Sequence, residues 1–172
     1  MNVLLSLGSN LGDRDRYLEN GIRSLEERAG TVRKRSATLD TPAYGLTDQP
    51  DFRNLALELE TALSPEELLS VLHEIEQEQD RVRLIHWGPR TLDLDIVYYG
   101  DLVMETEDLT IPHRDRLNRD FVLRPLAEIA PDFVDPVEQK TILTLLRELE
   151  QRSDGGPKEE KKADCKINLS VF

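Results

Sequence analysis

The sequence is poor in the features that mark exported, membrane-spanning and nucleic-acid-binding proteins. Its 172 residues include one cysteine, Cys165, which excludes an internal disulfide and suits a reducing compartment, the cytoplasm. No apolar run approaches the roughly 20 residues of a membrane-spanning helix, and residues 1–9 lack the basic start of a signal peptide. Acidic residues outnumber basic ones 34 to 22, and the net charge of −12 disfavours nucleic acids and anionic membranes as partners.

Within this acidic chain, basic residues gather in one segment. Arg81, Arg83, His86 and Arg90 lie close together, with a Gly-Pro break before the last of them. Such a cluster is typical either of a solvated loop or of a loop that binds an anion. Arginine has forked donors that match phosphate oxygens, so a polyphosphate is the anion that this segment would suit best.

Two aspartates follow the basic segment inside an apolar run. Residues 92–99 are rich in apolar and β-branched side chains and predict a short buried strand, which Asp93 and Asp95 interrupt. An i, i+2 spacing places both carboxylates on one face of a strand, roughly 7 Å apart. Two such ligands are too few to enclose Ca²⁺, but they suit Mg²⁺, which keeps waters and shares itself with substrate phosphates. The two segments together predict metal-assisted phosphate chemistry.

The pattern of the remaining chain predicts an α+β fold. Strands are expected at residues 3–7, 31–39, 52–61 and 92–99, and helices at residues 13–29 and 64–79. This βαββαβ order is that of a ferredoxin-like core, with a mostly antiparallel sheet, helices on one face and the other face open to a ligand. A hairpin and two helices after residue 100 would cover or rim that open face. We expect one domain, residues 1–152, and a flexible C-terminal tail, residues 153–172, which is rich in Gly and Lys/Glu.

Local patterns add detail to this outline. Ser64 is a strong helix N-cap, followed by Pro65 at the first helical position. Residues 40–51 contain two prolines and a glycine and predict a long loop. Alternation in residues 52–61 places Phe52 and Asn54 on one face, where an aromatic beside an amide fits either a binding site or a sheet edge. Arg114 and Arg116 fit either a solvated loop or a site.

A twelve-residue stretch carries a family resemblance. His86-Trp87-Gly88-Pro89-Arg90-Thr91-Leu92-Asp93-Leu94-Asp95-Ile96-Val97 resembles the signature of the 6-hydroxymethyl-7,8-dihydropterin pyrophosphokinase family. That signature is a basic residue, any residue, Gly or Ala, Pro, Arg, two residues, Asp-aliphatic-Asp and two aliphatic residues. Further matches in the same order are Gly8-Ser9-Asn10-Leu11, Thr41-Pro42, Asp48-Gln49-Pro50-Asp51-Phe52, Asn54, Arg81-Val82-Arg83, Pro112-His113 and Asn118-Arg119.

The resemblance implies an ATP-dependent diphosphotransferase of folate biosynthesis. Such an enzyme moves pyrophosphate from ATP, its co-substrate, to the pterin alcohol and releases AMP, with two Mg²⁺ ions held here by Asp93 and Asp95. The implied catalytic residues are Arg81, Arg90, Asp93 and Asp95. The implied pterin-binding residues are Thr41, Pro42, Tyr44, Phe52, Asn54 and Phe121. The implied ATP-binding residues are Glu76, Arg83, Trp87, Arg90, Ile96, Thr110, His113 and Arg119. A monomer with small-molecule partners is expected.

The chain also departs from the family pattern. Phe52 stands where tyrosine is common, the segment between Arg83 and Trp87 is one residue shorter than in a well-known bacterial form, and Asp108 and Arg114 replace a basic and an aromatic residue. Two other functions remain open. A non-catalytic ferredoxin-like RNA-binding module would use Phe52 but is opposed by the net charge. A two-metal phosphohydrolase would use the same aspartates without a pterin.

Overall fold

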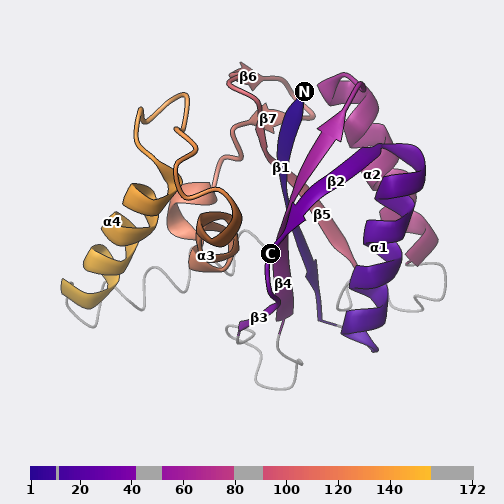
Figure 1. Ribbon diagram of the computed structural model, residues 1–172, viewed down its shortest axis with the longest axis horizontal. Helices are drawn as coiled ribbons and strands as arrows, with labels where there is room; N and C mark the ends of the chain where they lie inside the picture. The colour runs from indigo at the N-terminus through magenta and orange to yellow at the C-terminus, as the bar shows by residue number, and fades with distance from the viewer. Residues whose placement is uncertain (11, 42–51, 80–90, 156–172) are drawn as a thin grey trace.

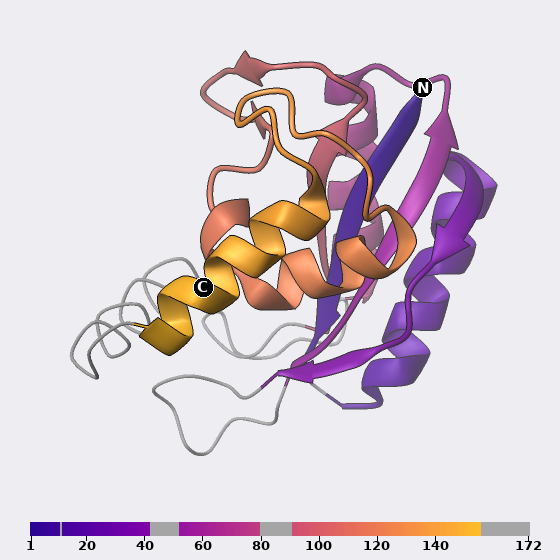
Figure 2. The ribbon, with the colours of Figure 1, turned by 60° about the vertical axis from the view of Figure 1, so that its left-hand side comes forward.

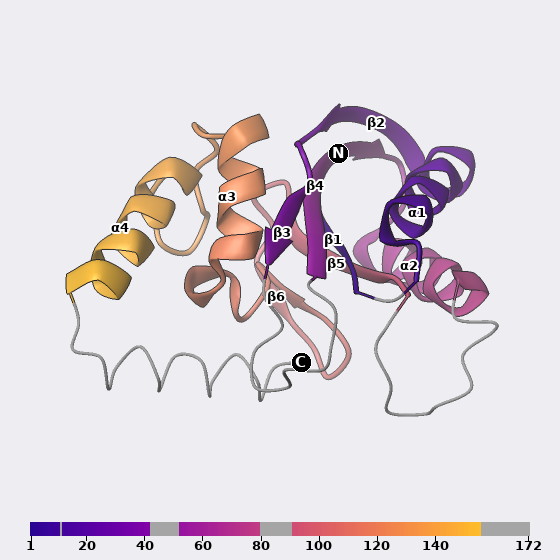
Figure 3. The same ribbon diagram turned by 90° about the horizontal axis from the view of Figure 1, so that it is seen from below.

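The computed structural model describes residues 1–10, 12–41, 52–79 and 91–155, which form three layers with a sheet in the middle (Figures 1 and 3). The strands are β1 (Asn2–Ser9), β2 (Gly30–Arg35), β3 (Leu39–Thr41), β4 (Phe52–Thr61), β5 (Asp93–Tyr99), β6 (Met104–Glu105) and β7 (Thr110–Ile111). The helices are α1 (Arg14–Arg28), α2 (Pro65–Gln79), η1 (Arg116–Asn118), α3 (Asp120–Ile129) and α4 (Ile142–Gly155). Within these ranges no helix is both long and apolar enough to cross a membrane.

The main sheet has the topology expected for a ferredoxin-like core. Its strand order is β2-β4-β1-β5, with every described neighbour antiparallel, and β3 pairs with the start of β4. Strands β6 and β7 form a separate hairpin after the core. The predicted α+β class, the βαββαβ order and the extra C-terminal hairpin and helices are therefore confirmed.

Strict alternation along the central strands supplies a separate core on each face of the sheet. Val3, Leu5 and Leu7 of β1 are buried in a cluster with apolar residues of α1 and α2, which cover one face (Figure 3). Leu4 points to the opposite face and joins a second cluster with residues of α3 and α4. Because α3 and α4 lie over only part of that face (Figure 2), its other part is left for polar side chains.

Helix α2 begins as its sequence predicts. The Ser64 hydroxyl accepts a hydrogen bond from the Glu67 N–H at 3.2 Å, and the Glu67 carboxylate accepts one from the Ser64 N–H at 3.0 Å. This reciprocal capping box pairs donors that a helix N-terminus otherwise leaves without partners. It fixes the start of the helix that carries Glu76.

Three local predictions need correction. The strand predicted at residues 31–39 is two strands, because the Ser36 hydroxyl accepts the Ala56 N–H and interrupts the pairing with β4. Residues 40 and 41, predicted as the start of a loop, belong to β3, and the rest of that predicted loop lies outside the described residues. Helix α4 reaches Gly155, so residues 153–155 are helical and do not begin the tail. Residues 156–172 lie outside the described part, where a flexible tail stays a prediction.

Candidate functional site

The polar part of the α3-side face is set by the strand register. Gly8 of β1 pairs with Asn54 of β4 on one side and with Asp93 of β5 on the other. The next row pairs Ser6 with Asp95. Neighbouring strands are about 4.8 Å apart, so the backbones of Asn54 and Asp93 are separated by roughly 10 Å, with only a glycine between them. One residue predicted for the pterin, Asn54, and one predicted for the metals, Asp93, therefore occupy one row.

An aromatic and amide corner lies at the β4 end of this row. Thr41 pairs with Phe52 through the β3–β4 ladder, and the Asn54 amide donates to the Thr41 hydroxyl at 3.2 Å. Phe121, at the start of α3, is 5 % exposed and belongs to the cluster that covers this face of the sheet. Four of the predicted pterin residues thus share one face. The other two, Pro42 and Tyr44, lie outside the described residues.

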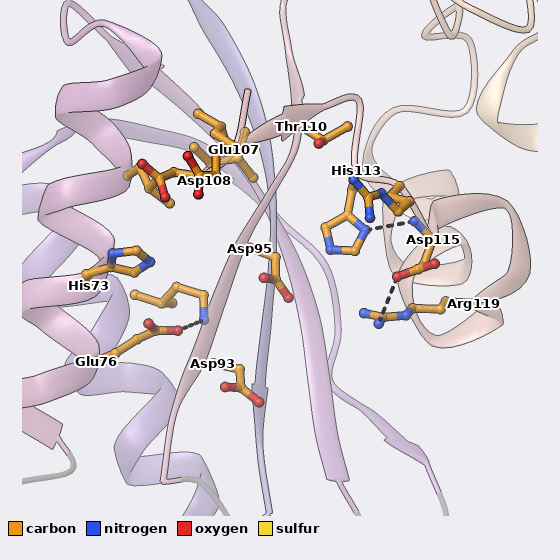
Figure 4. Close-up of a pocket in the computed structure, with 15 residues that line it drawn as sticks. His73, Glu76, Asp93, Asp95, Glu107, Asp108, Thr110, His113, Asp115 and Arg119 are labelled. Atoms are coloured by element: carbon orange, nitrogen blue, oxygen red, sulfur yellow. Dashed lines mark hydrogen bonds and ion pairs between the residues drawn. The ribbon is translucent and has the colours of Figure 1, made fainter. Parts of the chain in front are cut away.

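A cavity of about 520 Å³ runs along the outer edge of β5, between α2 and the segment from β7 to α3 (Figure 4). Seven of the residues predicted for ATP or metal binding line it: Glu76, Asp93, Asp95, Ile96, Thr110, His113 and Arg119. Figure 4 shows Asp93 and Asp95 between the residues of α2 and those of the His113 segment. The remaining predicted ATP-binding and catalytic residues, Arg81, Arg83, Trp87 and Arg90, lie outside the described part.

The described lining is strongly acidic. Two arginines, Arg114 and Arg119, face six carboxylates, those of Glu76, Asp93, Asp95, Glu107, Asp108 and Asp115. A polyphosphate placed against this lining would be repelled unless cations came with it. Within the described residues no group of three or more His, Cys, Asp or Glu side chains is arranged to enclose a metal. Two carboxylates with room for water and phosphate are the donor set that Mg²⁺ accepts.

His113 and Arg119 are held in place by Asp115. The Asp115 N–H donates to His113 Nδ1 at 3.1 Å, so Nδ1 is an acceptor and the ring proton of a neutral imidazole sits on Nε2. Burial lowers the pKa of His113, which favours that neutral form. The Asp115 carboxylate lies 3.5 Å from Arg119 Nη2, and the Arg119 guanidinium also lies 5.7 Å from the centre of the Phe121 ring. Arg119 therefore connects the cavity with the aromatic corner.

Glu76 has a structural contact inside the cavity. Its carboxylate accepts the Leu94 N–H at 2.8 Å, on the edge of β5 that no other strand of the described sheet covers. This bond satisfies a donor that an edge strand leaves unpaired. Glu76 therefore ties α2 to the strand that carries Asp93 and Asp95.

Several lining residues escaped sequence reasoning: Leu69, His73, Glu107, Leu109 and Asp115. His73 lies one helical turn before Glu76, a spacing that signals a shared face but not what that face covers. Asp115 follows His113 by two residues in a segment without periodicity, so only the folded chain reveals its contact. Asp108 and Arg114, two of the departures from the family pattern, both line the cavity.

Comparison with known proteins decides the family. A family model described as 7,8-dihydro-6-hydroxymethylpterin-pyrophosphokinase matches residues 4–131. The chain belongs to this family. The match includes the aspartate pair, β4 and the His113–Phe121 segment, so the resemblance of the motifs is confirmed.

Curated relatives agree with this assignment. A 2-amino-4-hydroxy-6-hydroxymethyldihydropteridine pyrophosphokinase of Synechocystis is 46 % identical over 149 residues, covering 86 % of this chain and 76 % of the relative. The Haemophilus influenzae protein of the same name is 45 % identical over 140 residues, covering 81 % and 88 %. A bifunctional protein FolKE of Lactococcus lactis is 48 % identical over 126 residues, covering 73 % of this chain. The chain spans only 36 % of that relative's length.

Solved structures share the fold of this chain. The HPPK-DHPS of Plasmodium falciparum, as its A437G variant with SDX-DHP, superposes with a TM-score of 0.73 at 18 % sequence identity. The superposition covers 88 % of this chain and 46 % of that one. At so low an identity the likeness shows a common fold.

Proposed function

We propose that the chain transfers the pyrophosphoryl group of ATP to 6-hydroxymethyl-7,8-dihydropterin, giving the pterin diphosphate and AMP. The observation that supports the proposal is the row Asn54–Gly8–Asp93, which brings the Asn54 amide close to the strand that carries the Asp93 and Asp95 carboxylates. Phosphoryl transfer asks a protein mainly for positioning and charge stabilisation, and this row supplies both over a short distance.

The pterin subsite would use Phe52, Asn54 and Phe121. The two aromatic rings would stack on the pterin, and the Asn54 amide, already oriented by Thr41, would bond its polar edge. The ordering of these groups before the substrate arrives reduces the entropic cost of binding. Thr41, Pro42 and Tyr44 would complete the polar contacts.

The nucleotide would lie in the β5 cavity. His113 can donate from Nε2, Arg119 and Thr110 offer further donors, and Ile96 and Glu76 would border the nucleotide, with Arg83 and Trp87 from the preceding segment. Two Mg²⁺ ions, held by Asp93 and Asp95, would neutralise the phosphates and polarise the one under attack. Arg81 and Arg90 would stabilise charge as it develops. We also propose that the enzyme is cytoplasmic and monomeric.

The test is a product assay on the purified chain. With ATP, Mg²⁺ and 6-hydroxymethyl-7,8-dihydropterin, AMP and pterin diphosphate should form in equal amounts, measured by chromatography, and chelation of Mg²⁺ should stop both. ATP with Mg²⁺ but no pterin should give neither AMP nor phosphate. Phosphate release without pterin would favour a phosphohydrolase, and salt-sensitive, Mg²⁺-independent RNA retention without turnover would favour an RNA-binding module.

Gly8 offers a specific check of the row. A Cβ at this position would lie 2.8 Å from Asn54 Oδ1, while its other close neighbours lie at 3.8 Å. In Gly8→Ala the Asn54 amide should turn away while the strand stays in place. We expect pterin affinity to fall about tenfold, equivalent to about 1.4 kcal/mol, with little change in unfolding free energy. Calorimetric titration and urea unfolding measure the two quantities.

The control for Gly8 is a double-mutant cycle with Asn54→Ala. If the added methyl acts only through Asn54, it should have no further effect on pterin affinity when that amide is already absent. Independent, additive losses would show that Gly8 does not act through Asn54.

A further inference from the structure

We propose that Arg116, which does not line the cavity, is the positioning residue that fixes His113 and Arg119 for the nucleotide. It does so by joining the backbone of His113 to the buried Asp135 carboxylate. The inference extends the proposed function, because it assumes that this cavity is the nucleotide site. The sequence suited both Arg114 and Arg116 to either a solvated loop or a site. The Arg114 side chain lines the cavity and is 71 % exposed, whereas the Arg116 side chain is 7 % exposed and lies outside the cavity lining.

Asp135 is the fixed point of the cluster. Its side chain is fully buried and accepts five hydrogen bonds: from Tyr98 Oη at 2.6 Å, Arg116 Nε at 2.6 Å, Arg116 Nη2 at 3.2 Å, and the N–H groups of Val137 and Glu138 at 2.8 and 2.9 Å. Burial alone would raise the pKa of Asp135, but the hydrogen bonds from Arg116 and Tyr98 outweigh it and hold that pKa below its ordinary value. The carboxylate is therefore ionised and its contacts are charge-assisted, the strongest kind.

Tyr98 contributes one of these five hydrogen bonds and comes from the sheet. Tyr98 belongs to β5, the strand that carries Asp93 and Asp95, and its ring packs against Phe133 with 4.8 Å between ring centres. The Arg116 guanidinium carbon lies 6.0 Å from the centre of the Tyr98 ring. Arg116 is thus held by an ion pair with Asp135 and by the face of the Tyr98 ring. Tyr98 lies on the same strand as Asp93 and Asp95.

From this fixed position Arg116 reaches the cavity segment. Arg116 Nη1 donates to the His113 carbonyl at 3.0 Å, and the His113 N–H donates to the Val97 carbonyl of β5 at 2.9 Å. Both sides of His113 are therefore tied to β5, one directly and one through Arg116. Any shift of the His113 carbonyl would move Asp115, whose N–H sets the imidazole and whose carboxylate meets Arg119 (Figure 4).

Two test variants and two controls separate positioning from stability. Arg116→Lys keeps the charge but cannot direct donors at Asp135 and His113 together. Arg116→Met/Asp135→Asn removes both charges together. A buried ion left without its partner is the usual reason that a variant of an ion pair fails to fold, and this double variant leaves none. Tyr98→Phe is the matched control, since it keeps the ring beside Arg116, leaves Asp135 four of its five hydrogen bonds and leaves the Arg116–His113 bond in place. Arg124→Met, at an exposed arginine of α3, controls for lost surface charge.

The experiment measures the protonated ring nitrogen of His113 by spectroscopy and, separately, the KM for ATP. Long-range ¹H–¹⁵N spectra of the full chain, with His113 assigned by His113→Gln, report which ring nitrogen carries the proton. Both Arg116 variants should lose the single Nε2–H form, and their KM for ATP should rise about tenfold, the usual size of losses from residues that orient a binding group. Tyr98→Phe and Arg124→Met should keep the wild-type spectrum and KM, although Tyr98→Phe should lower the melting temperature.

The outcomes decide the proposal in either direction. If the Arg116 variants retain the His113 spectrum of Tyr98→Phe and a KM within about twofold of it, Arg116 only stabilises the fold and the inference is overturned. If the wild-type chain makes no AMP, the proposed function fails, and the spectra alone still show whether Arg116 orients His113.

Discussion

Replacing Asp95 by alanine is expected to abolish pyrophosphoryl transfer while the fold remains. Asp95 takes part in the sheet through its backbone, opposite Ser6, and its carboxylate faces the cavity (Figure 4). Removing it takes one negative charge away from a lining that already has an excess of them. Arg119 loses the charge of Asp95 but keeps the Asp115 carboxylate at 3.5 Å, so no buried cation is left without a partner. Loss of a group that stabilises transition-state charge lowers turnover by about 10²–10³-fold or more.

Steady-state AMP formation at saturating Mg²⁺ measures this effect, and circular dichroism with urea unfolding checks the fold. Asp95→Asn keeps the shape of the side chain and removes its charge, so it should lose nearly as much activity as Asp95→Ala. Asp101→Ala, in the exposed turn after β5, controls for the loss of an acid elsewhere on the surface. Turnover near that of the wild type in Asp95→Ala would refute the metal assignment.

The aspartate pair shows which part of the site a sequence can predict. Strand periodicity alone places Asp93 and Asp95 on one face, and the same rule places Phe52 with Asn54. The rule does not predict that the aspartate pair and the Phe52–Asn54 pair lie on the same face of one sheet. Their proximity depends on the pairing of both strands with β1 across Gly8, a contact between segments that are distant in sequence.

Irregular segments limited the rest of the prediction. Helix η1 was not predicted, because three residues give no period to detect. Arg114 and Arg116 are chemically identical in the sequence, and only the distance from Arg116 to Asp135, a residue with no motif around it, separates a buried ion pair from an exposed side chain. Capping, in contrast, depends on neighbouring residues, which explains why the start of α2 at Ser64 was predicted correctly.

Phe121→Ala should produce a second large effect, with separate consequences for binding and for stability. Its ring is 5 % exposed and packs with Leu4 and Ala56 over the sheet, so its removal should lower the unfolding free energy by about 3–5 kcal/mol. If the same ring stacks on the pterin, its loss should also weaken pterin binding by about 1–3 kcal/mol, the range for aromatic stacking on nucleobases. Urea unfolding measures the first change and calorimetric titration measures the second.

Two further variants separate these consequences. Phe121→Leu fills most of the cavity but offers no aromatic face, so pterin affinity should fall as in Phe121→Ala while most of the stability returns. Phe133→Leu removes a ring from the same apolar cluster, where Phe133 packs on Tyr98 and not on the polar row. It should lower stability and leave pterin affinity unchanged.

Because Arg119 lies over the Phe121 ring, Phe121→Leu should also weaken ATP binding slightly, a coupling between the two subsites that Phe133→Leu should not show. Equal pterin affinity in Phe121→Leu and the wild type would exclude the stacking role and leave Phe121 a core residue.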